Sequence, residues 1–191
     1  MTNVRQGFFS ESDIQNVLAN LSDDGLRDFV EWAAWTGQRK GEIASLTWKM
    51  IDGNEIRIPG ELCKNRRPRV IPLGSELLRI VERRKQLRRV LCFDGVARLA
   101  EPIFHRGDGK PIGEFKKSWK TATMKAGCSE RLFHDLRRTC ARRLLAAGVP
   151  QVVARELTGY RTSAMFDRYA IVSSVGVLAA QERVERFRRE A

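Results

Sequence analysis

The stretch RLFHDLRRTCARRLL, residues 131–145, contains one of the two histidines of the chain. His134 and Arg137 are three positions apart, so both side chains project from one face of a helix. An arginine fork binds phosphate oxygens through two parallel hydrogen bonds, and an imidazole beside it can brace the phosphate or accept a proton. Taken alone, an H-x-x-R pair is more typical of a surface histidine beside solvated arginines, so its interpretation depends on other positions.

A strongly basic composition indicates a polyanionic partner. The chain of 191 residues has 35 lysines and arginines against 23 aspartates and glutamates, a formal charge of +12 and a pI near 10.2. Nucleic acid is the commonest polyanion in a cell. A membrane partner is disfavoured, because the sequence has neither a lipidation signal nor an apolar run of transmembrane length.

The cysteines, which are Cys63, Cys92, Cys128 and Cys140, do not indicate redox or metal chemistry. No two of them form a C-x-x-C motif, and none stands near a histidine in a zinc-binding spacing. The sequence also lacks a carboxylate cluster for a metal and a Gly-rich loop for ATP phosphates. Because the N-terminus has no apolar signal-peptide segment, we expect a reduced, cytoplasmic protein with structural cysteines and no cofactor.

Hydrophobic periodicity predicts a mainly α protein with a small antiparallel β-sheet, an α+β class. Ser10, with Asp13 three positions later, predicts a capped helix start, and Gly37 predicts the end of the second helix. Arg39 then lies at the junction between the second and third helices. The predicted helices span residues 10–21, 25–37, 39–48, 75–91, 114–127, 131–148, a short segment from 150, 162–170 and about 174–191.

Two alternating segments predict a β-hairpin with a basic tip. In NEIRIPG, Ile56 and Ile58 lie on one face, and PRVIPL follows after the polar tip CKNRR. After the hairpin, Ser75 predicts the N-cap of a helix that continues to about Leu91 and buries Val81 and Leu91.

Three further motifs extend the H-x-x-R pair into an ordered pattern. TGQRKGEI contains Arg39, CKNRRPRVIPL places Lys64 at the hairpin tip, and LTGYRTSAMFDRYA contains both tyrosines of the chain, Tyr160 and Tyr169. In this order the motifs resemble those of the tyrosine recombinases, the phage integrase family, over about residues 10–170. The resemblance implies the tyrosine recombinase catalytic-domain fold and an enzyme of DNA recombination and integration carried by a mobile genetic element.

The resemblance also implies a set of catalytic residues. At Tyr160, nine positions before Tyr169, the family usually has a histidine or a tryptophan. A phenol also donates a hydrogen bond, so we expect Tyr160 to contact a phosphate oxygen. Glu42 takes the family's supporting position. The implied catalytic residues are the arginines Arg39 and Arg137, the hairpin lysine Lys64, the histidine His134, the nucleophile Tyr169 and the substituted position Tyr160.

This residue set suits transesterification of a phosphodiester. Arg39 and Arg137 would clamp the two non-bridging oxygens, and Lys64 would protonate the leaving 5′-oxygen. Ionising a phenol of pKa near 10 at pH 7 costs about 4 kcal/mol, which surrounding cations offset. A 3′-phosphotyrosine conserves the bond energy, so DNA is cut and rejoined without a high-energy cofactor. His134 either accepts the tyrosine proton or braces the phosphate.

Simpler interpretations remain open at single positions. Tyr169 in isolation fits a core tyrosine, and Lys64 with Arg66, Arg67 and Arg69 fits a solvated hairpin edge. For the whole chain, the alternatives are a DNA-binding accessory protein that lost the reaction and an enzyme similar to type IB topoisomerases.

The resemblance implies one catalytic domain over residues 1–191, with a tail helix over about 174–191. The N-terminal DNA-binding domain of relatives is expected to be absent, so the chain is either an excised fragment or a naturally short relative. Double-stranded DNA is the implied partner, bound by a homo-oligomer that forms a tetramer on paired sites. The tail either docks on a neighbouring protomer or folds back on its own domain.

Overall fold

The computed structural model describes residues 7–63, 66–91, 95–160, 162, 166 and 174–190. Within these residues the protein is mainly helical with two small antiparallel sheets, which confirms the predicted fold class. The helices are α1 (Glu11–Ala19), α2 (Asp24–Thr36), α3 (Lys40–Ala44), α4 (Ser75–Gln86), α5 (Lys116–Lys125), α6 (Phe133–Ala146), α7 (Gln151–Thr158) and α9 (Ser174–Glu190). The strands are β1 (Ile51–Asp52), β2 (Glu55–Ile58), β3 (Arg69–Pro72), β4 (Arg89–Leu91) and β5 (Ala97–Leu99).

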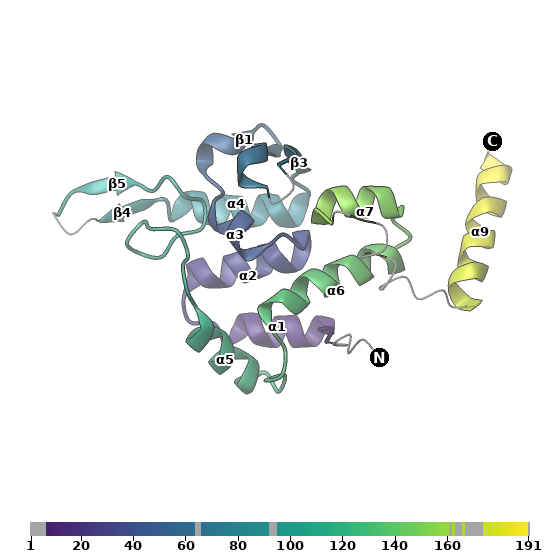
Figure 1. Cartoon of the computed structure of the whole chain (residues 1–191), viewed down its shortest axis with the longest axis horizontal. Helices are drawn as coiled ribbons and strands as arrows, with labels where there is room; N and C mark the ends of the chain where they lie inside the picture. Colours follow the sequence, from purple (N-terminus) through teal and green to yellow (C-terminus); the bar gives the residue numbers. More distant parts are fainter. Residues whose placement is uncertain are drawn as a thin grey trace.

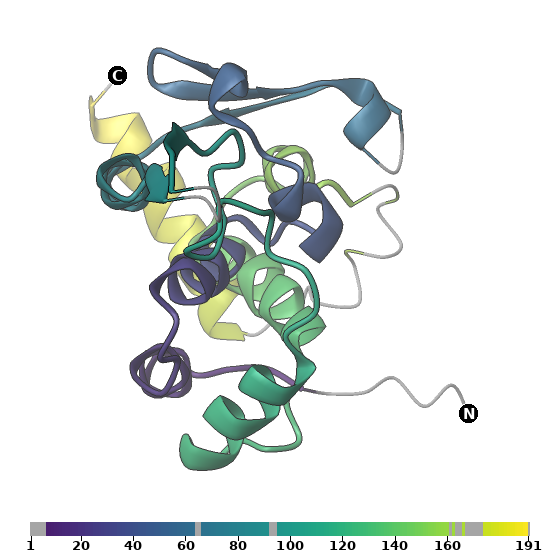
Figure 2. The same cartoon turned by 90° about the vertical axis from the view of Figure 1, so that its left-hand side faces the viewer.

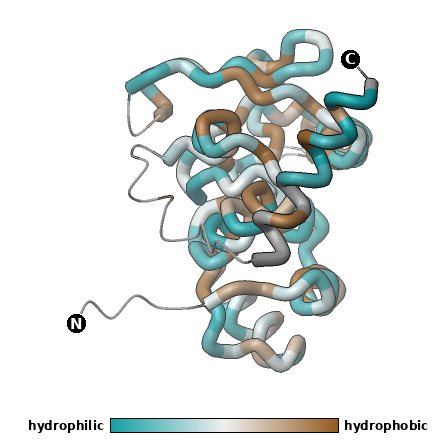
Figure 3. The backbone as a smooth tube through the Cα atoms, turned by 90° about the vertical axis from the view of Figure 1, so that its right-hand side faces the viewer, coloured by the Kyte–Doolittle hydropathy of each residue, from teal (hydrophilic) through white to brown (hydrophobic). Residues whose placement is uncertain are grey.

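The helices and the larger sheet form layers. Helices α2 and α6 pack against each other in the middle of the molecule, and α7 packs on α6 (Figure 1). Helices α1 and α5 lie on one side of this pair, and the β1–β2–β3 sheet lies on the other (Figure 2). The ribbon of helix α9 lies to one side of the other helices in Figure 1, with the side chain of Arg183 against Gly148 after α6, and the C-terminal part of α9 is mainly hydrophilic (Figure 3).

Local sequence signals set the helix ends as expected. The side chain of Ser10 accepts a hydrogen bond from the backbone of Asp13, and the Asp13 side chain returns one, which is a complete capping box. Gly37 adopts a left-handed conformation with φ of 61° and ends α2. A Cβ at this glycine would also lie 3.1 Å from the side chains of Cys140 and Thr158. The chain therefore turns sharply at Gly37 and places Arg39 as the N-cap of α3.

The predicted hairpin is present as strands β2 and β3 of a three-stranded sheet in the order β1-β2-β3. Strands β2 and β3 pair antiparallel, with Ile56 opposite Ile71 and Ile58 opposite Arg69. All four of these side chains point toward the core and are at most 5% exposed. The period of two therefore directs Arg69 inward, so the interpretation of this residue as part of a solvated edge is wrong.

The helix predicted over residues 75–91 is shorter than expected. Gly74, not Ser75, is the N-cap residue, and α4 ends at Gln86. The chain then forms β4, which pairs with β5 in a projecting hairpin. In β4 the burial alternates, so Val90 is buried while Leu91 is 70% exposed. A short apolar run fits the periodicity of a helix and that of a strand, and here the hydrogen bonds between β4 and β5 stabilise the strand.

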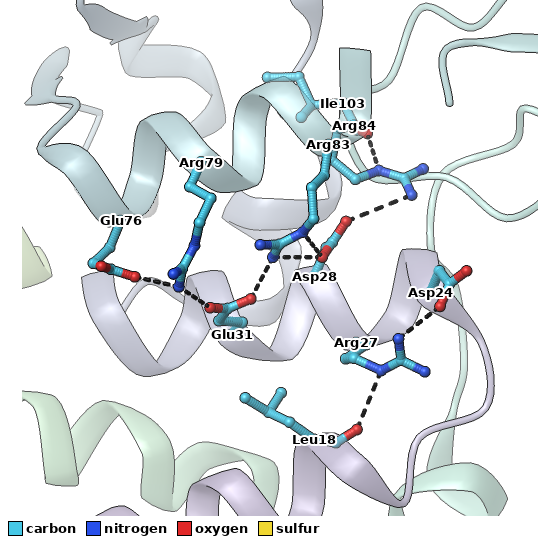
Figure 4. Close-up of polar contacts among 10 residues, drawn as sticks. All are labelled: Leu18, Asp24, Arg27, Asp28, Glu31, Glu76, Arg79, Arg83, Arg84 and Ile103. Carbon is cyan, nitrogen blue, oxygen red and sulfur yellow. Dashed lines mark hydrogen bonds and ion pairs between the residues drawn. The ribbon is translucent and has the colours of Figure 1, made fainter. Parts of the chain in front are cut away.

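A charge network joins α2 to α4 on the side away from α6 (Figure 4). Arg83 donates to Asp28 at 2.8 and 3.0 Å and pairs with Glu31. Arg84 is only 2% exposed, and it donates to the carbonyls of Ile103 and His105 while facing Asp28 at 3.8 Å. Burial raises the pKa of Asp28, and the hydrogen bond and charge of Arg83 oppose that shift. The network anchors the loop at residues 103–105 to α2 and α4.

We expect Asp28→Ala to lower the free energy of unfolding by about 3–5 kcal/mol, because it leaves the buried guanidinium of Arg84 without its carboxylate. Urea unfolding followed by circular dichroism measures the change. Asp24→Ala is the matched control, since Asp24 on the same helix is exposed and pairs with Arg27. This control should lose about 1 kcal/mol or less. Equal losses in the two variants would contradict a special role for the buried pair.

Among the residues that the structure describes, no helix is long and apolar enough to cross a membrane. In the same part of the chain, no group of three or more histidines, cysteines or carboxylates is placed to hold a metal ion. Cys63, Cys128 and Cys140 are buried free thiols, and burial raises the pKa of Cys140 to about 12.

Candidate active site

Three arginines from distant parts of the chain converge on the C-terminal end of α7. Arg39 comes from the start of α3, Arg69 from β3 and Arg137 from the second turn of α6. The side chain of Arg39 is 25% exposed, whereas Arg69 and Arg137 are only 5% and 3% exposed as residues. Burying two guanidinium groups so completely is costly unless specific partners compensate.

The first compensation is a row of backbone carbonyls. Arg69 donates to the carbonyl of Leu157 at 2.5 Å, and Arg137 donates to the next carbonyl, that of Thr158. Arg39 approaches the carbonyl of Gly159 at 3.4 Å. The last carbonyls of a helix have no partner within it and carry its partial negative charge, so they stabilise clustered cations.

The second compensation is Glu42, which is 4% exposed and lies between two of the arginines. Its Oε1 accepts from Arg39 at 2.8 Å, and its Oε2 accepts from Arg69 at 3.0 Å. Both carboxylate oxygens are therefore used, one for each guanidinium. Because the same carboxylate holds both side chains, their positions depend on each other.

Arg137 retains an unused donor. Its Nη1 donates to the carbonyls of Gly37, at 2.6 Å, and of Thr158. Its buried Nη2 has no hydrogen-bond partner among the residues that the structure describes. Burial lowers the pKa of Arg137 to about 10, and the nearby charge of Arg39 contributes to the shift. The guanidinium stays charged at neutral pH, and an anion bound beside it would relieve this unfavourable environment.

Tyr160 lies directly against Arg137. The guanidinium carbon is 4.0 Å from the centre of the tyrosine ring, within the range of a cation–π contact. The ring is 7% exposed and packs edge-on against Phe166 at 5.3 Å. The fold thus brings Tyr160 to the cluster, where its aromatic face contacts the guanidinium of Arg137; its contact with a phosphate oxygen stays a prediction.

His134 lies in the first turn of α6, one turn before Arg137. Asp135 holds this turn, since its carboxylate accepts the backbone N–H of Leu132 at 2.8 Å. His134, Arg39 and Arg137 line one cavity of about 340 Å³. Partial desolvation lowers the pKa of the exposed His134 below 6.5, and the charges of Arg137 and Arg138 act in the same direction. The imidazole is therefore neutral at pH 7 and available as a proton acceptor.

Two predicted site residues lie outside the described residues, namely Lys64 and Tyr169. Their catalytic assignment stays a prediction.

The remaining arginines of α6 already have partners within the protein. Arg138 pairs with Asp135 at 3.4 Å, and Arg143 pairs with Glu11. The guanidinium of Arg142 lies over the ring of Phe8, 4.7 Å from its centre. Arg142 and Arg143 therefore join Phe8 and the start of α1 to α6, whereas the pair of Arg138 lies within α6.

Sequence reasoning missed two residues of this site, Arg69 and Gln38. Gln38 is 2% exposed, lines the same cavity, and accepts a hydrogen bond from the Trp32 indole at 2.6 Å. Arg69 is two positions before Ile71, so in a strand both side chains lie on the same buried face. This spacing is the signal that would have identified Arg69.

Comparison with known proteins identifies relatives of the chain. The model of the phage integrase family matches residues 8–174. The integrase of Salmonella phage P22 is 28% identical over 166 residues, which cover 80% of this chain and 41% of that protein. An integrase of Saccharopolyspora erythraea is 38% identical over 78 residues, 39% of this chain and 18% of that protein. The chain therefore spans less than half the length of these curated relatives.

Solved structures share the fold. XerA recombinase matches with a TM-score of 0.70 and 18% identity, over 94% of this chain and 66% of that chain. A lambda integrase dimer bound to a COC′ core site matches with a TM-score of 0.67 and 20% identity, over 90% of this chain and 61% of that chain. A lambda integrase tetramer bound to a Holliday junction matches with a TM-score of 0.67 and 19% identity, over 91% of this chain and 52% of that chain.

Proposed function

Because the chain belongs to the phage integrase family, we propose that it is a site-specific recombinase that cleaves and rejoins double-stranded DNA through a 3′-phosphotyrosine at Tyr169. The observation that carries this proposal is the buried donor of Arg137 in a cluster of arginines. Such a cluster has an excess of positive charge and an unused N–H, which are the features that a phosphate diester requires.

The proposed roles follow from the resemblance to the family and from the chemistry of each group, and the positions of Arg39, His134 and Arg137 around one cavity support them. Arg39 and Arg137 bind the two non-bridging oxygens and stabilise the extra negative charge of the pentacoordinate transition state. The hydroxyl of Tyr169 attacks the phosphorus, and the O–P bond to the 5′-oxygen breaks. Lys64 gives a proton to that leaving oxygen. Rejoining reverses these steps, with the 5′-hydroxyl of a DNA strand as nucleophile.

His134 is the group that we assign to accept the proton of Tyr169. Its lowered pKa supports this role, because the imidazole is unprotonated at the pH at which the phenol must lose its proton. Tyr160 holds Arg137 in place through its ring, and its hydroxyl is assigned to a phosphate oxygen.

The assignment of His134 predicts a specific pH dependence. The second-order rate constant for cleavage should be constant from pH 8 to about 6.5 and should fall at lower pH, because protonation then removes the acceptor. Rates measured at limiting DNA concentration report the groups of the free protein. His134→Asn should remove this acidic decline, whereas His105→Asn, at the other histidine, should retain it. A decline that persists in His134→Asn would assign it to another group.

DNA binding by an assembly of several protomers is part of the proposal. The charge of +12 supports a polyanionic partner, and the solved lambda integrase tetramer bound to a Holliday junction supports a tetramer on paired sites. We propose that the whole chain forms one catalytic domain, with α9 as its tail, and that it acts in the cytoplasm on behalf of a phage or another mobile element.

The test is recovery of a covalent protein–DNA adduct. A library of duplexes with a randomised core and a nick is incubated with the protein, and strands that remain attached after denaturation are sequenced. The nick lets the short cleaved fragment diffuse away, so the adduct accumulates. A recurrent sequence at the attachment point would support a site-specific recombinase. Adducts without sequence preference, together with relaxation of any supercoiled plasmid, would favour a topoisomerase. DNA binding without formation of an adduct would favour an inactive accessory protein.

A further inference from the structure

Arg69 belongs to the arginine cluster and bonds both Glu42 and the end of α7, although it is not among the residues to which the family resemblance assigns a catalytic role. Its Nη1 donates to Glu42 and its Nη2 to the carbonyl of Leu157, so one side chain joins α3 to the end of α7. The ion pair with Glu42 is almost completely buried, since both side chains are 4% exposed. Water therefore does not substitute for the contact with Glu42.

The contact with Glu42 reaches the proposed phosphate clamp. Glu42 uses one oxygen for Arg69 and the other for Arg39, so the orientation of its carboxylate depends on both. The contact with Leu157 acts on the neighbouring carbonyls of α7, which hold Arg137 and Arg39. Arg69 thus influences the positions of both Arg39 and Arg137 without contacting either of them. It acts through Glu42 and through the carbonyl groups at the end of α7.

The chain leaves space for this side chain. Gly159 ends α7 with φ of 71°, and a Cβ at this position would lie 2.4 Å from Nη1 of Arg69. A residue with a side chain would therefore displace the guanidinium as well as strain the backbone. Lysine would not replace Arg69, because a single ammonium lacks the planar fork that reaches Glu42 and Leu157 in two directions.

Arg69 also connects the clamp to the hairpin. It is the first residue of β3, five positions after Lys64, and it pairs with Ile58 of β2. The strand that follows the hairpin tip is thereby held at a defined place relative to Glu42 and α7.

Resting on the proposed function, we infer that Arg69 is a positioning residue for DNA cleavage. It aligns Arg39 and Arg137 on the scissile phosphate by holding Glu42 and the C-terminal end of α7 in place.

The experiment compares Arg69→Met and Arg69→Lys with the control Arg57→Met. Arg57 lies on the neighbouring strand β2, and its side chain is 59% exposed and pairs with Asp52. Cleavage is measured in single turnovers at saturating concentrations of the adduct-forming duplex, and DNA affinity is measured separately. In Arg69→Met the cleavage rate should fall roughly 10- to 100-fold, by analogy with the loss caused by removing the residues that orient the ligands of a metal site. Its affinity for DNA should change less than about threefold, because most phosphate contacts lie elsewhere.

Arg69→Lys separates positioning from folding. It keeps the buried charge beside Glu42, so it should retain the native circular dichroism spectrum, yet it should cleave nearly as slowly as Arg69→Met because the fork is lost. A rate equal to that of the unaltered protein in the folded Arg69→Lys variant would overturn the inference.

Inorganic phosphate provides a second readout that does not depend on cleavage. Phosphate bound by Arg39 and Arg137 should raise the melting temperature of the unaltered protein and of Arg57→Met equally. In Arg69→Lys most of this phosphate-dependent increase in melting temperature should be lost. If the unaltered protein forms no adduct, the proposed function fails. The rise in melting temperature caused by phosphate still decides whether Arg69 positions Arg39 and Arg137. An undiminished increment in Arg69→Lys would show that Arg69 serves packing alone.

Discussion

Tyr169→Phe is expected to abolish the covalent protein–DNA adduct while leaving DNA affinity within about twofold of the unaltered protein. Only the attacking oxygen is removed, and no other group of the protein forms a bond to phosphorus in the proposed mechanism. Binding depends mainly on phosphate contacts made by lysines and arginines, which this change leaves in place. The adduct is quantified by its slower migration in a denaturing gel, and affinity by fluorescence anisotropy of a labelled duplex.

The only other tyrosine of the chain provides the control. Tyr160→Phe keeps the ring against Arg137 and removes one hydrogen bond to a charged oxygen, worth about 1.5–3 kcal/mol. Its adduct should form roughly 10- to 100-fold more slowly and reach the same final yield. An adduct in Tyr169→Phe that disappears in Tyr160→Phe would identify Tyr160 as the nucleophile.

Arg137→Lys should slow cleavage by about 10²–10³-fold, the loss typical for one donor to a developing negative charge in a dry site. Lysine keeps the charge, but it lacks the fork that serves the carbonyls of Gly37 and Thr158 while leaving Nη2 for the phosphate. Single-turnover rates at saturating DNA measure this effect, and melting temperatures report any loss of folding.

Arg143→Lys is the matched control on the same helix, because Arg143 pairs with Glu11 at the surface and does not reach the cluster. It should change the cleavage rate less than about twofold. If Arg137→Lys is folded and cleaves as fast as this control, Arg137 does not contact the phosphate in the transition state, and the clamp must be assigned to other side chains.

The local features of the protein were predictable because they depend on neighbouring residues alone. Ser10 with Asp13 caps α1, Gly37 ends α2, and the alternation of Ile56 and Ile58 produces β2. Each of these signals acts over a few positions, through a hydrogen bond to a nearby backbone group, a permitted φ angle or a repeating burial pattern. The order of the motifs also identified the family, which the match over residues 8–174 confirms.

Helix α4 shows where local signals were insufficient. Leu91 continues an apolar pattern after Gln86, yet its backbone pairs with β5 and its side chain is 70% exposed. The choice between helix and strand was made by hydrogen bonds to a segment further along the chain, which local periodicity does not encode.

By itself the sequence determined most of the helices, the β2–β3 hairpin, the family and the identity of the residues proposed to carry the chemistry. Only the tertiary structure decided how Arg137 meets Gly37 across 100 positions, how Arg39 meets Gly159 across 120, and that Arg69 is buried between Glu42 and Leu157. The physical reason is that a guanidinium is buried only where carbonyls and a carboxylate converge on it. That convergence arises from the packing of α2, α6, α7 and β3, and no single segment of the chain specifies it.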